Sequence, residues 1–171
     1  MTNISAYKRF VANEPESAIE YRTIELYHPD FSETYRFVKS FTNQTFTLES
    51  DSPRNPSEDI EFLAAGMRIT EPAERDDGEQ FLNVAIGNVD GRIKSILDQI
   101  SGASFLTPVE VVYRKYLSTN PDAPANNPLY MSASTFNFSG RTSAEFTAED
   151  ANLAVKRSGK IYTTQDFPGL A

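Results

Sequence analysis

Short stretches with alternating apolar and polar residues recur along this chain and limit the folds open to it. Residues 19–27 alternate in this way and are rich in aromatic and β-branched residues, which favour strands. Similar strand-like stretches lie at residues 35–38, 44–48, 60–70, 81–86, 109–117, 129–138 and 142–146. Turn-forming residues such as Pro29 and Asp30 separate them. We therefore expect roughly eight or nine short strands that are linked by hairpins.

Two segments have helical periodicity instead. The first is a short amphipathic stretch over about residues 1–14, which ends before Pro15. The second follows Asn88 and Asp90, either of which can cap it, and places on one face Ile93, Ile96, Leu97 and Ile100. The pattern as a whole predicts a mainly β fold: an antiparallel β-sandwich or barrel with one central packed helix and a short N-terminal helix.

The chain length of 171 residues fits a single domain, which we place over residues 1–171. Gly66 lies inside the strand-like stretch 60–70 and predicts a bulge there. Residues 156–171 lack regular periodicity and predict an extended C-terminal arm. This arm is basic at first and then ends in the apolar pair Phe167 and Leu170. Such an ending is typical of a segment that docks into a core or a partner.

The composition excludes several kinds of chemistry. The chain has no cysteine, so disulfides, thiolate nucleophiles and zinc–thiolate sites cannot form. It has a single histidine, His28, and a net charge of -8, which disfavours a nucleic-acid partner. The first residues lack the apolar region of a signal peptide, and no apolar run is long enough to cross a bilayer. We expect a product of the cytoplasm that does not insert into a membrane.

The sequence contains no complete catalytic motif. The Ser-Gly pairs at residues 101–102 and 139–140 lack the first glycine of a nucleophile elbow. Ser158-Gly159-Lys160 lacks the upstream glycine and the final hydroxyl residue of a phosphate-binding loop. Residues 87–91 can cradle an anion, but a capped turn between a strand and a helix is the favoured interpretation. We therefore expect no enzyme activity, no catalytic residue, no cofactor and no bound metal.

Acidic residues gather in the loop of residues 50–59 with the adjoining Glu61, and in the loop of residues 71–80. They could bind a cation, but their spacing differs from that of an EF-hand, and exposed, solvated loops are favoured. His28, beside Pro29 and Asp30, could have a functional role. A turn histidine that forms local hydrogen bonds is the favoured interpretation.

Tyr113 and Tyr116 lie beside two basic residues, which raises the alternative of a stacking surface for nucleic acid. Their strand periodicity favours half-buried aromatics or interface residues. Together with Tyr162, Phe167 and Leu170, they are the predicted interface residues.

Four segments resemble, in their order and spacing, a family of phage tail proteins. They are residues 24–31 (Ile-Glu-Leu-Tyr-His-Pro-Asp-Phe), residues 82–89, residues 109–124, and Tyr162 with the terminal Phe-Pro-Gly-Leu. The resemblance covers about residues 15–171. The family is known mainly as a domain of unknown function. Its genes lie between the tape-measure gene and those for the cell-wall peptidase and host specificity.

This resemblance implies a structural component of a bacteriophage tail tip or baseplate, made in the host cytoplasm and incorporated into the virion. It implies a homo-oligomeric ring, of either the distal-tail type with six subunits or the hub type with three. The expected partners are the tail tube, the tape measure and the central fibre or hub protein. Two alternatives stay open: a tail-assembly chaperone that is absent from the virion, and a carbohydrate-binding module. The absence of tryptophan counts against the latter.

Overall fold

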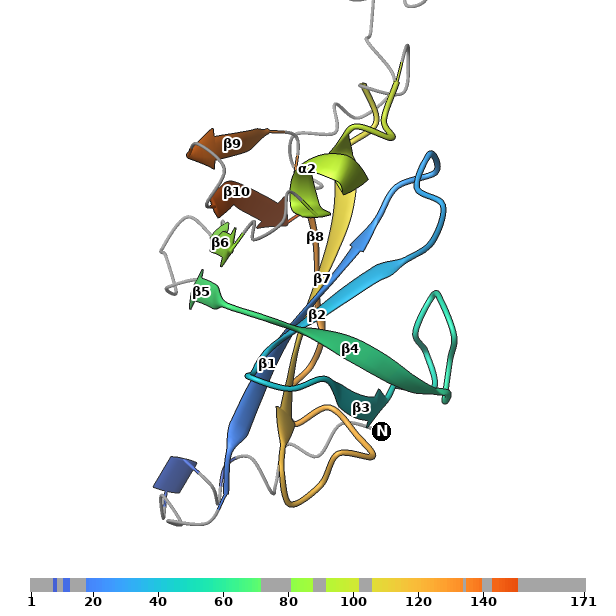
Figure 1. The fold of residues 1–171 in the computed structure, drawn as a ribbon. Coiled ribbons are helices and arrows are strands. Elements are labelled where there is room, and N and C mark those ends of the chain that lie inside the picture. Colours follow the sequence, from blue (N-terminus) through green and yellow to red (C-terminus); the bar gives the residue numbers. More distant parts are fainter. Residues whose placement is uncertain are drawn as a thin grey trace, which may run out of the picture.

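The computed structural model describes residues 8, 11–12, 18–71, 81–87, 92–101, 106–133, 135–139 and 143–150 (Figure 1). The mainly β fold predicted from the sequence is confirmed. The strands are β1 (Glu20–Tyr27), β2 (Tyr35–Lys39), β3 (Gln44–Thr47), β4 (Asp59–Ala65), β5 (Met67–Thr70), β6 (Phe81–Gly87), β7 (Val109–Leu117), β8 (Leu129–Ala133), β9 (Phe136–Ser139) and β10 (Ser143–Asp150). The central helix is α2 (Arg92–Leu97).

The strands form one hydrogen-bonded path in the order β3-β4-β2-β1-β7-β8-β10-β6-β5, and β9 pairs with β10. The pairs are antiparallel except β2–β4, which is parallel. This pair is the departure from the predicted hairpin-linked, antiparallel pattern. It arises because β4 lies between β2 and β3, although β2 and β3 are consecutive in the sequence.

β4 and β5 lie near opposite ends of this path, yet only Gly66 separates them in the sequence. Figure 1 shows β4 leading directly into β5. The predicted strand over residues 60–70 is therefore two strands, and the chain crosses from one end of the sheet to the other at Gly66. There Gly87 N–H donates to the Gly66 carbonyl at 2.8 Å. A Cβ at residue 87 would lie 3.3 Å from that oxygen, so glycine permits the close approach.

One apolar core contains residues from strands in both halves of the sheet. The sheet therefore curves around this core. Its buried residues come from β1, β2, β5, β6, β7, β8, β10 and α2, and include Ile24, Leu82 and Val111. The helix buries Ile93 and Ile96 in this core, while Leu97 and Ile100 pack against it. The helix face predicted from the sequence is thus confirmed. We call this cluster the main core.

A smaller aromatic core lies on the opposite face of β7. It consists of Val38, Phe46, Leu48, Phe62 and Tyr116. The rings of Phe46 and Tyr116 stack at 4.2 Å between centroids. Because the main core and this second core lie on opposite faces, β7 is buried on both sides, and every residue from 111 to 117 is buried.

Two predicted terminal elements fall largely outside the described residues. Of the helix predicted over about residues 1–14, the structure describes Lys8, Val11 and Ala12, which are helical. The C-terminal arm predicted over residues 156–171 is outside the described part of the chain altogether. Within that described part, no helix has the length and apolar character needed to cross a membrane.

Candidate functional site

The most unusual feature of the protein is a cluster of charges buried beside the central strand β7. The Arg114 side chain is fully buried and faces two buried carboxylates. Its Nε donates to both carboxylate oxygens of Glu49, at 3.1 and 2.8 Å, and its Nη2 donates to Oε1 at 2.7 Å. Its Nη1 donates to Glu25 Oε2 at 3.1 Å. We call these three residues, with Arg36 and Arg54, the Arg114 cluster.

Strand register explains why Glu25 and Arg114 meet. In the β1–β7 pair, Thr23 lies opposite Arg114, and Ile24 lies opposite Tyr113. Ile24 and Tyr113 face the main core, so their alternating neighbours must face the other side. Glu25 is therefore on the same face as Arg114. The loop of residues 48–58, which leads from β3 to β4, supplies Glu49 from a distant part of the sequence.

Two further arginines of the Arg114 cluster pair with Glu25. Glu25 accepts hydrogen bonds from Arg36 Nε and from Arg54 Nε, both at 3.1 Å. Arg54 also reaches Glu110 at 2.8 Å, and its guanidinium lies 4.1 Å from the centre of the Tyr27 ring. Burying a charge is costly unless it is paired, so these contacts make the buried carboxylates tolerable.

The loop of residues 48–58 is fixed around this cluster. The Glu49 carbonyl accepts from Ser52 N and Ser57 N, at 3.1 and 3.3 Å. Arg36 Nη2 donates to the Asn55 side chain at 2.9 Å. Asn55 and Ser57 have positive φ values of 53° and 59°, which non-glycine residues rarely adopt. The loop therefore has one defined shape. Ser52 is buried, which corrects the exposed loop predicted over residues 50–59, and Glu49, just before that range, is buried as well.

The acidic side chains in and near this loop point to separate partners. Glu58 accepts from Asn55 at 2.8 Å, and Asp59 accepts from Thr47 at 2.6 Å. Glu61 accepts from Asn43 at 3.3 Å. Among the described residues, no group of three or more acidic or histidine side chains is arranged to hold a metal ion.

The electrostatics of the Arg114 cluster favour fixed charges. Burial alone would raise the pKa of Glu49, but the hydrogen bond and the charge of Arg114 lower it below its ordinary value. Burial alone would lower the pKa of Arg114, but the two carboxylates raise it. Burial and the hydrogen bond to Glu49 raise the pKa of Tyr130 to about 12. None of these groups is therefore poised to exchange a proton near neutral pH, and the cluster is suited to holding the loop in place.

A second, smaller ion cluster lies on the main-core face of β7. Glu71 accepts from Tyr113 Oη at 3.0 Å and from Lys115 Nζ at 2.6 Å. Arg22 Nη1 lies 3.5 Å from Glu71. Burial alone would raise the pKa of Glu71, but the hydrogen bond and charge of Lys115 lower it. The sequence placed Glu71 in an exposed acidic loop, which is wrong for this residue, because it is anchored to β7. Residues 72–80 are outside the described residues.

The structure corrects part of the predicted interface. Tyr113 and Tyr116 are 1% and 0% exposed, so they offer no surface to a partner. They are buried because the main core covers one face of β7 and the aromatic core covers the other. Tyr162, Phe167 and Leu170 lie outside the described residues, so their prediction stands as it was made.

His28 has the local role that the sequence favoured. Its side chain is buried at the turn after β1. Nδ1 accepts from Asp30 N at 3.1 Å, and the His28 carbonyl accepts from Phe31 N at 3.0 Å. These bonds close the turn.

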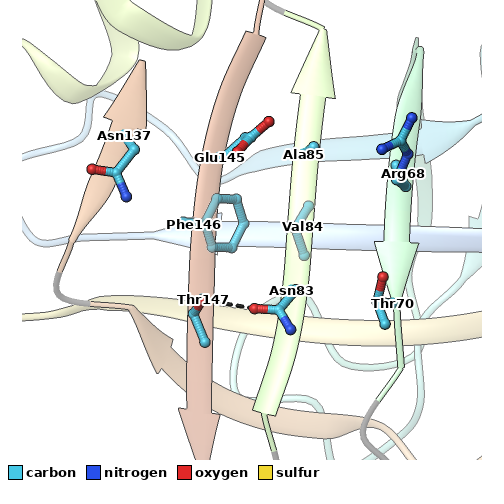
Figure 2. A pocket seen from close by; sticks show the side chains of 9 residues that line it. All are labelled: Arg68, Thr70, Asn83, Val84, Ala85, Asn137, Glu145, Phe146 and Thr147. Carbon is cyan, nitrogen blue, oxygen red and sulfur yellow. Dashed lines mark hydrogen bonds between the residues drawn. The ribbon is translucent and has the colours of Figure 1, made fainter. Parts of the chain in front are cut away.

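A polar groove of about 250 Å³ lies on the outer face of β5, β6, β10 and β9 (Figure 2). Its hydrogen-bonding side chains are exposed and belong to Arg68, Thr70, Asn83, Asn137, Glu145 and Thr147. Thr147 donates to Asn83 at 2.7 Å, and Phe146 is buried toward the main core. The groove is thus polar and has no exposed ring among its lining residues.

A protein-family model matches most of the chain. A family described as "Domain of unknown function (DUF1833)" matches residues 5–148, which include both ion clusters and all of the described strands except the last two residues of β10. The chain belongs to the DUF1833 family. A search of curated proteins finds no match. The match ends before residues 156–171, so the Arg114 cluster belongs to the DUF1833 domain while the predicted arm follows it.

Proposed function

We propose that this DUF1833 protein is a structural subunit of a bacteriophage tail tip or baseplate. In this role it forms a homo-oligomeric ring that joins the tail tube to the host-recognition apparatus. The observation that carries the proposal is the resemblance of residues 24–31, 82–89 and 109–124 to phage tail proteins. These segments correspond to β1 with its turn, to β6, and to β7 with the loop that follows it. They form much of the main core, so the resemblance concerns the framework of the fold.

The chemistry of the described residues supports a scaffold. The buried ionisable groups of the Arg114 cluster are held by ion pairs, three of them to Glu25 and one between Glu49 and Arg114, and they fix a surface loop. A ring subunit needs such a rigid frame, because its loops must meet neighbours in one fixed geometry. The proposed partners are further copies of this chain, the tail tube, the tape measure and the central fibre or hub protein.

Mass spectrometry of purified virions tests the proposal. We expect the protein in the particle at a small, fixed ratio to the tail-tube protein, and in isolated tail tips by antibody labelling. Phage lacking the gene should release no complete tails. A requirement for tail formation without detection in the particle would overturn the proposal in favour of a tail-assembly chaperone. The tail-tube protein and a host cytoplasmic enzyme serve as positive and negative controls.

The polar groove of Figure 2 favours a second candidate, carbohydrate binding at the host surface. Its exposed amide, hydroxyl and guanidinium groups can hydrogen-bond to sugars. Stacking on an aromatic ring, which commonly adds to such binding, cannot come from Phe146, because that ring is 3% exposed. Calorimetric titration with host polysaccharide would test this function. Asn83→Ala should abolish any heat of binding, while Thr45→Ala on the distant strand β3 should not change it.

A further inference from the structure

An apolar groove of about 460 Å³ lies at the open end of the main core, beside strand β9. Its apolar lining comes from the end of α2 and from β7, β8 and β9, through Leu97, Ile100, Val109, Ala133, Phe136 and Phe138. Phe138 is 41% exposed, and Leu106, just before β7, is 90% exposed. The groove therefore adjoins exposed apolar surface.

Strand pairing explains why this groove exists. β8 pairs with β7 as far as Val109 opposite Ala133. Pro108 precedes this last pair, and proline cannot donate to a strand ladder. The chain continues from β8 into β9, which pairs with β10. Among the described residues, β9 has no partner on its second edge, so a strand is missing at the place where β7 would have to continue.

An unpaired edge beside an apolar groove is suited to strand addition. The main chain of the added segment supplies hydrogen bonds to the edge, and its alternate side chains fill the groove. The β9 edge is four residues long, so an added segment of about four residues can pair with its free backbone N–H and C=O groups. The occupant must therefore be extended, rich in strand-forming residues and apolar at one end.

We propose that residues 160–170 of a second copy of this chain occupy the β9 edge and the groove. This inference rests on the proposed ring, which supplies the neighbouring copy. Residues 161–164 read Ile-Tyr-Thr-Thr, a run of strand-forming residues that matches the length of β9. Phe167 and Leu170 follow and supply apolar side chains for the groove.

Charge favours the same occupant. Lys156 and Arg157 come just before this segment and Lys160 begins it, whereas the whole chain has a net charge of -8. Asp98 lines the groove and is exposed, with Lys94 Nζ 2.6 Å from its carboxylate. A basic stretch is attracted to a neighbouring copy of this acidic chain.

The course of β10 favours a neighbouring copy over the same chain. β10 begins at Ser143, opposite Ser139 at the end of β9, and ends at Asp150, opposite Met131 of β8. It thus carries the chain away from its own groove. Its two edges are taken by β6 on one side and by β8 and β9 on the other. Residues 151–159 can span up to about 30 Å, a length that serves either occupant, so the choice of a neighbouring copy rests on the direction of β10 and on the proposed ring.

Light scattering coupled to size exclusion tests the groove. We expect the full chain to form an oligomer, and we expect Phe138→Asp and Leu170→Asp each to raise its dissociation constant by at least about tenfold. Phe41→Asp is the matched control, because Phe41 is equally apolar, fully exposed and outside the groove. Circular dichroism checks that each variant is folded. Oligomers of unchanged mass for folded Phe138→Asp would overturn the inference.

Site-directed cross-linking identifies the occupant, because the chain has no cysteine of its own. Thr107→Cys at the groove and Thr163→Cys are made in separate chains and mixed with a short bis-maleimide linker. A mixed dimer is expected for this pair, and none for Thr45→Cys with Thr163→Cys. A link that forms only within one chain carrying both Thr107→Cys and Thr163→Cys would overturn the exchange between copies.

The two proposals can fail separately. If virions contain the protein but the mixed dimer is absent, the exchange is wrong and the tail-tip role stands. If the mixed dimer forms but virions lack the protein, the exchange stands and the tail-tip role is wrong.

Discussion

The two faces of β7 bury charge in different ways. On the main-core face, apolar residues such as Val111 fill the interior, and the ion pair of Lys115 and Glu71 lies at the margin, where the Glu71 side chain is 33% exposed. On the other face, Arg114 and its carboxylate partners are buried at the centre with 0–1% exposure. One strand thus carries a partly solvated pair on one side and a fully desolvated cluster on the other.

This difference follows from what covers each face. Strands and α2 cover the main core and bring apolar side chains, whereas the loop of residues 48–58 covers the Arg114 cluster. A loop has no strand ladder to fix its position, so local backbone hydrogen bonds and side-chain ion pairs must do so. A buried ion pair adds little net stability, but it penalises any arrangement that leaves a charge unpaired. The Arg114 cluster therefore specifies one loop conformation. The pair of Lys115 and Glu71 constrains the chain around it much less, because it is partly solvated.

Arg114→Met gives the largest expected effect. It leaves the carboxylates of Glu25 and Glu49 buried without their central partner, so the free energy of unfolding should fall by about 3–5 kcal/mol. Urea denaturation followed by circular dichroism measures the loss. A loss below about 1 kcal/mol would mean that the loop moves aside and lets water reach the carboxylates, which would contradict a fixed cluster.

Glu49→Gln should cost less, about 1.5–3 kcal/mol at neutral pH, because the amide keeps the shape but loses the charge-assisted bonds. The folded-state pKa of Glu49 is lowered, so its contribution is present above the unfolded value of 4.5 and is lost as pH falls through the folded value. The stabilities of the wild type and the variant should therefore converge below pH 4.5. Urea titrations from pH 7 to pH 3 test this, and a gap that stays constant over this range would show that the charge of Glu49 is unimportant.

Lys115→Met removes the partner of Glu71 from the ion pair at the margin of the main core. Lys115 directly follows Arg114, so this variant and Arg114→Met compare the two faces of β7. Glu71 keeps solvent and the nearby Arg22, so we expect a loss of only about 1 kcal/mol in the same urea assay. Added salt should reduce this loss, because the pair is partly exposed. If Lys115→Met were as damaging as Arg114→Met, the contrast between the two faces would be wrong.

Ser57→Gly should have the smallest effect, and it should be stabilising. Ser57 holds a positive φ of 59°, which glycine adopts without steric cost. The greater freedom of glycine in the unfolded chain offsets part of this gain, so the unfolding free energy should rise by under about 1 kcal/mol. Thermal melts of Ser57→Gly and the exposed control Ser101→Gly check the sign. A lower melting temperature for Ser57→Gly than for the wild type would show that the loop needs the Ser57 hydroxyl.

Local pattern was enough to predict most of the elements. The face formed by Ile93 and Ile96 identified α2, and strand periodicity located the strands on either side of it. β7 also contains neighbouring apolar pairs, Val111 with Val112 and Tyr116 with Leu117. Because neighbouring residues of a strand point to opposite faces, such pairs are typical of a strand that is buried on both faces. Arg114 and Lys115 within such a strand must be paired, and Tyr113 and Tyr116 cannot be surface residues.

The partner of Arg114 could not be predicted in the same way. Glu49 is 65 positions away in the sequence and reaches Arg114 because β4 inserts between β2 and β3, which brings the loop of residues 48–58 over this face. The same insertion creates the parallel pair that the hairpin pattern did not predict. Strand order depends on contacts between distant segments, and neither periodicity nor turn residues report those contacts.

The sequence by itself determined which segments are strands and which is the central helix, because period and turn chemistry act over a few neighbouring residues. It also determined that no cysteine chemistry is open to the chain. Only the tertiary structure decided which charges are buried and which strands of the described residues keep one edge open. Burial is a property of what packs against a residue, and here that is decided by β4 and by the loop that precedes it.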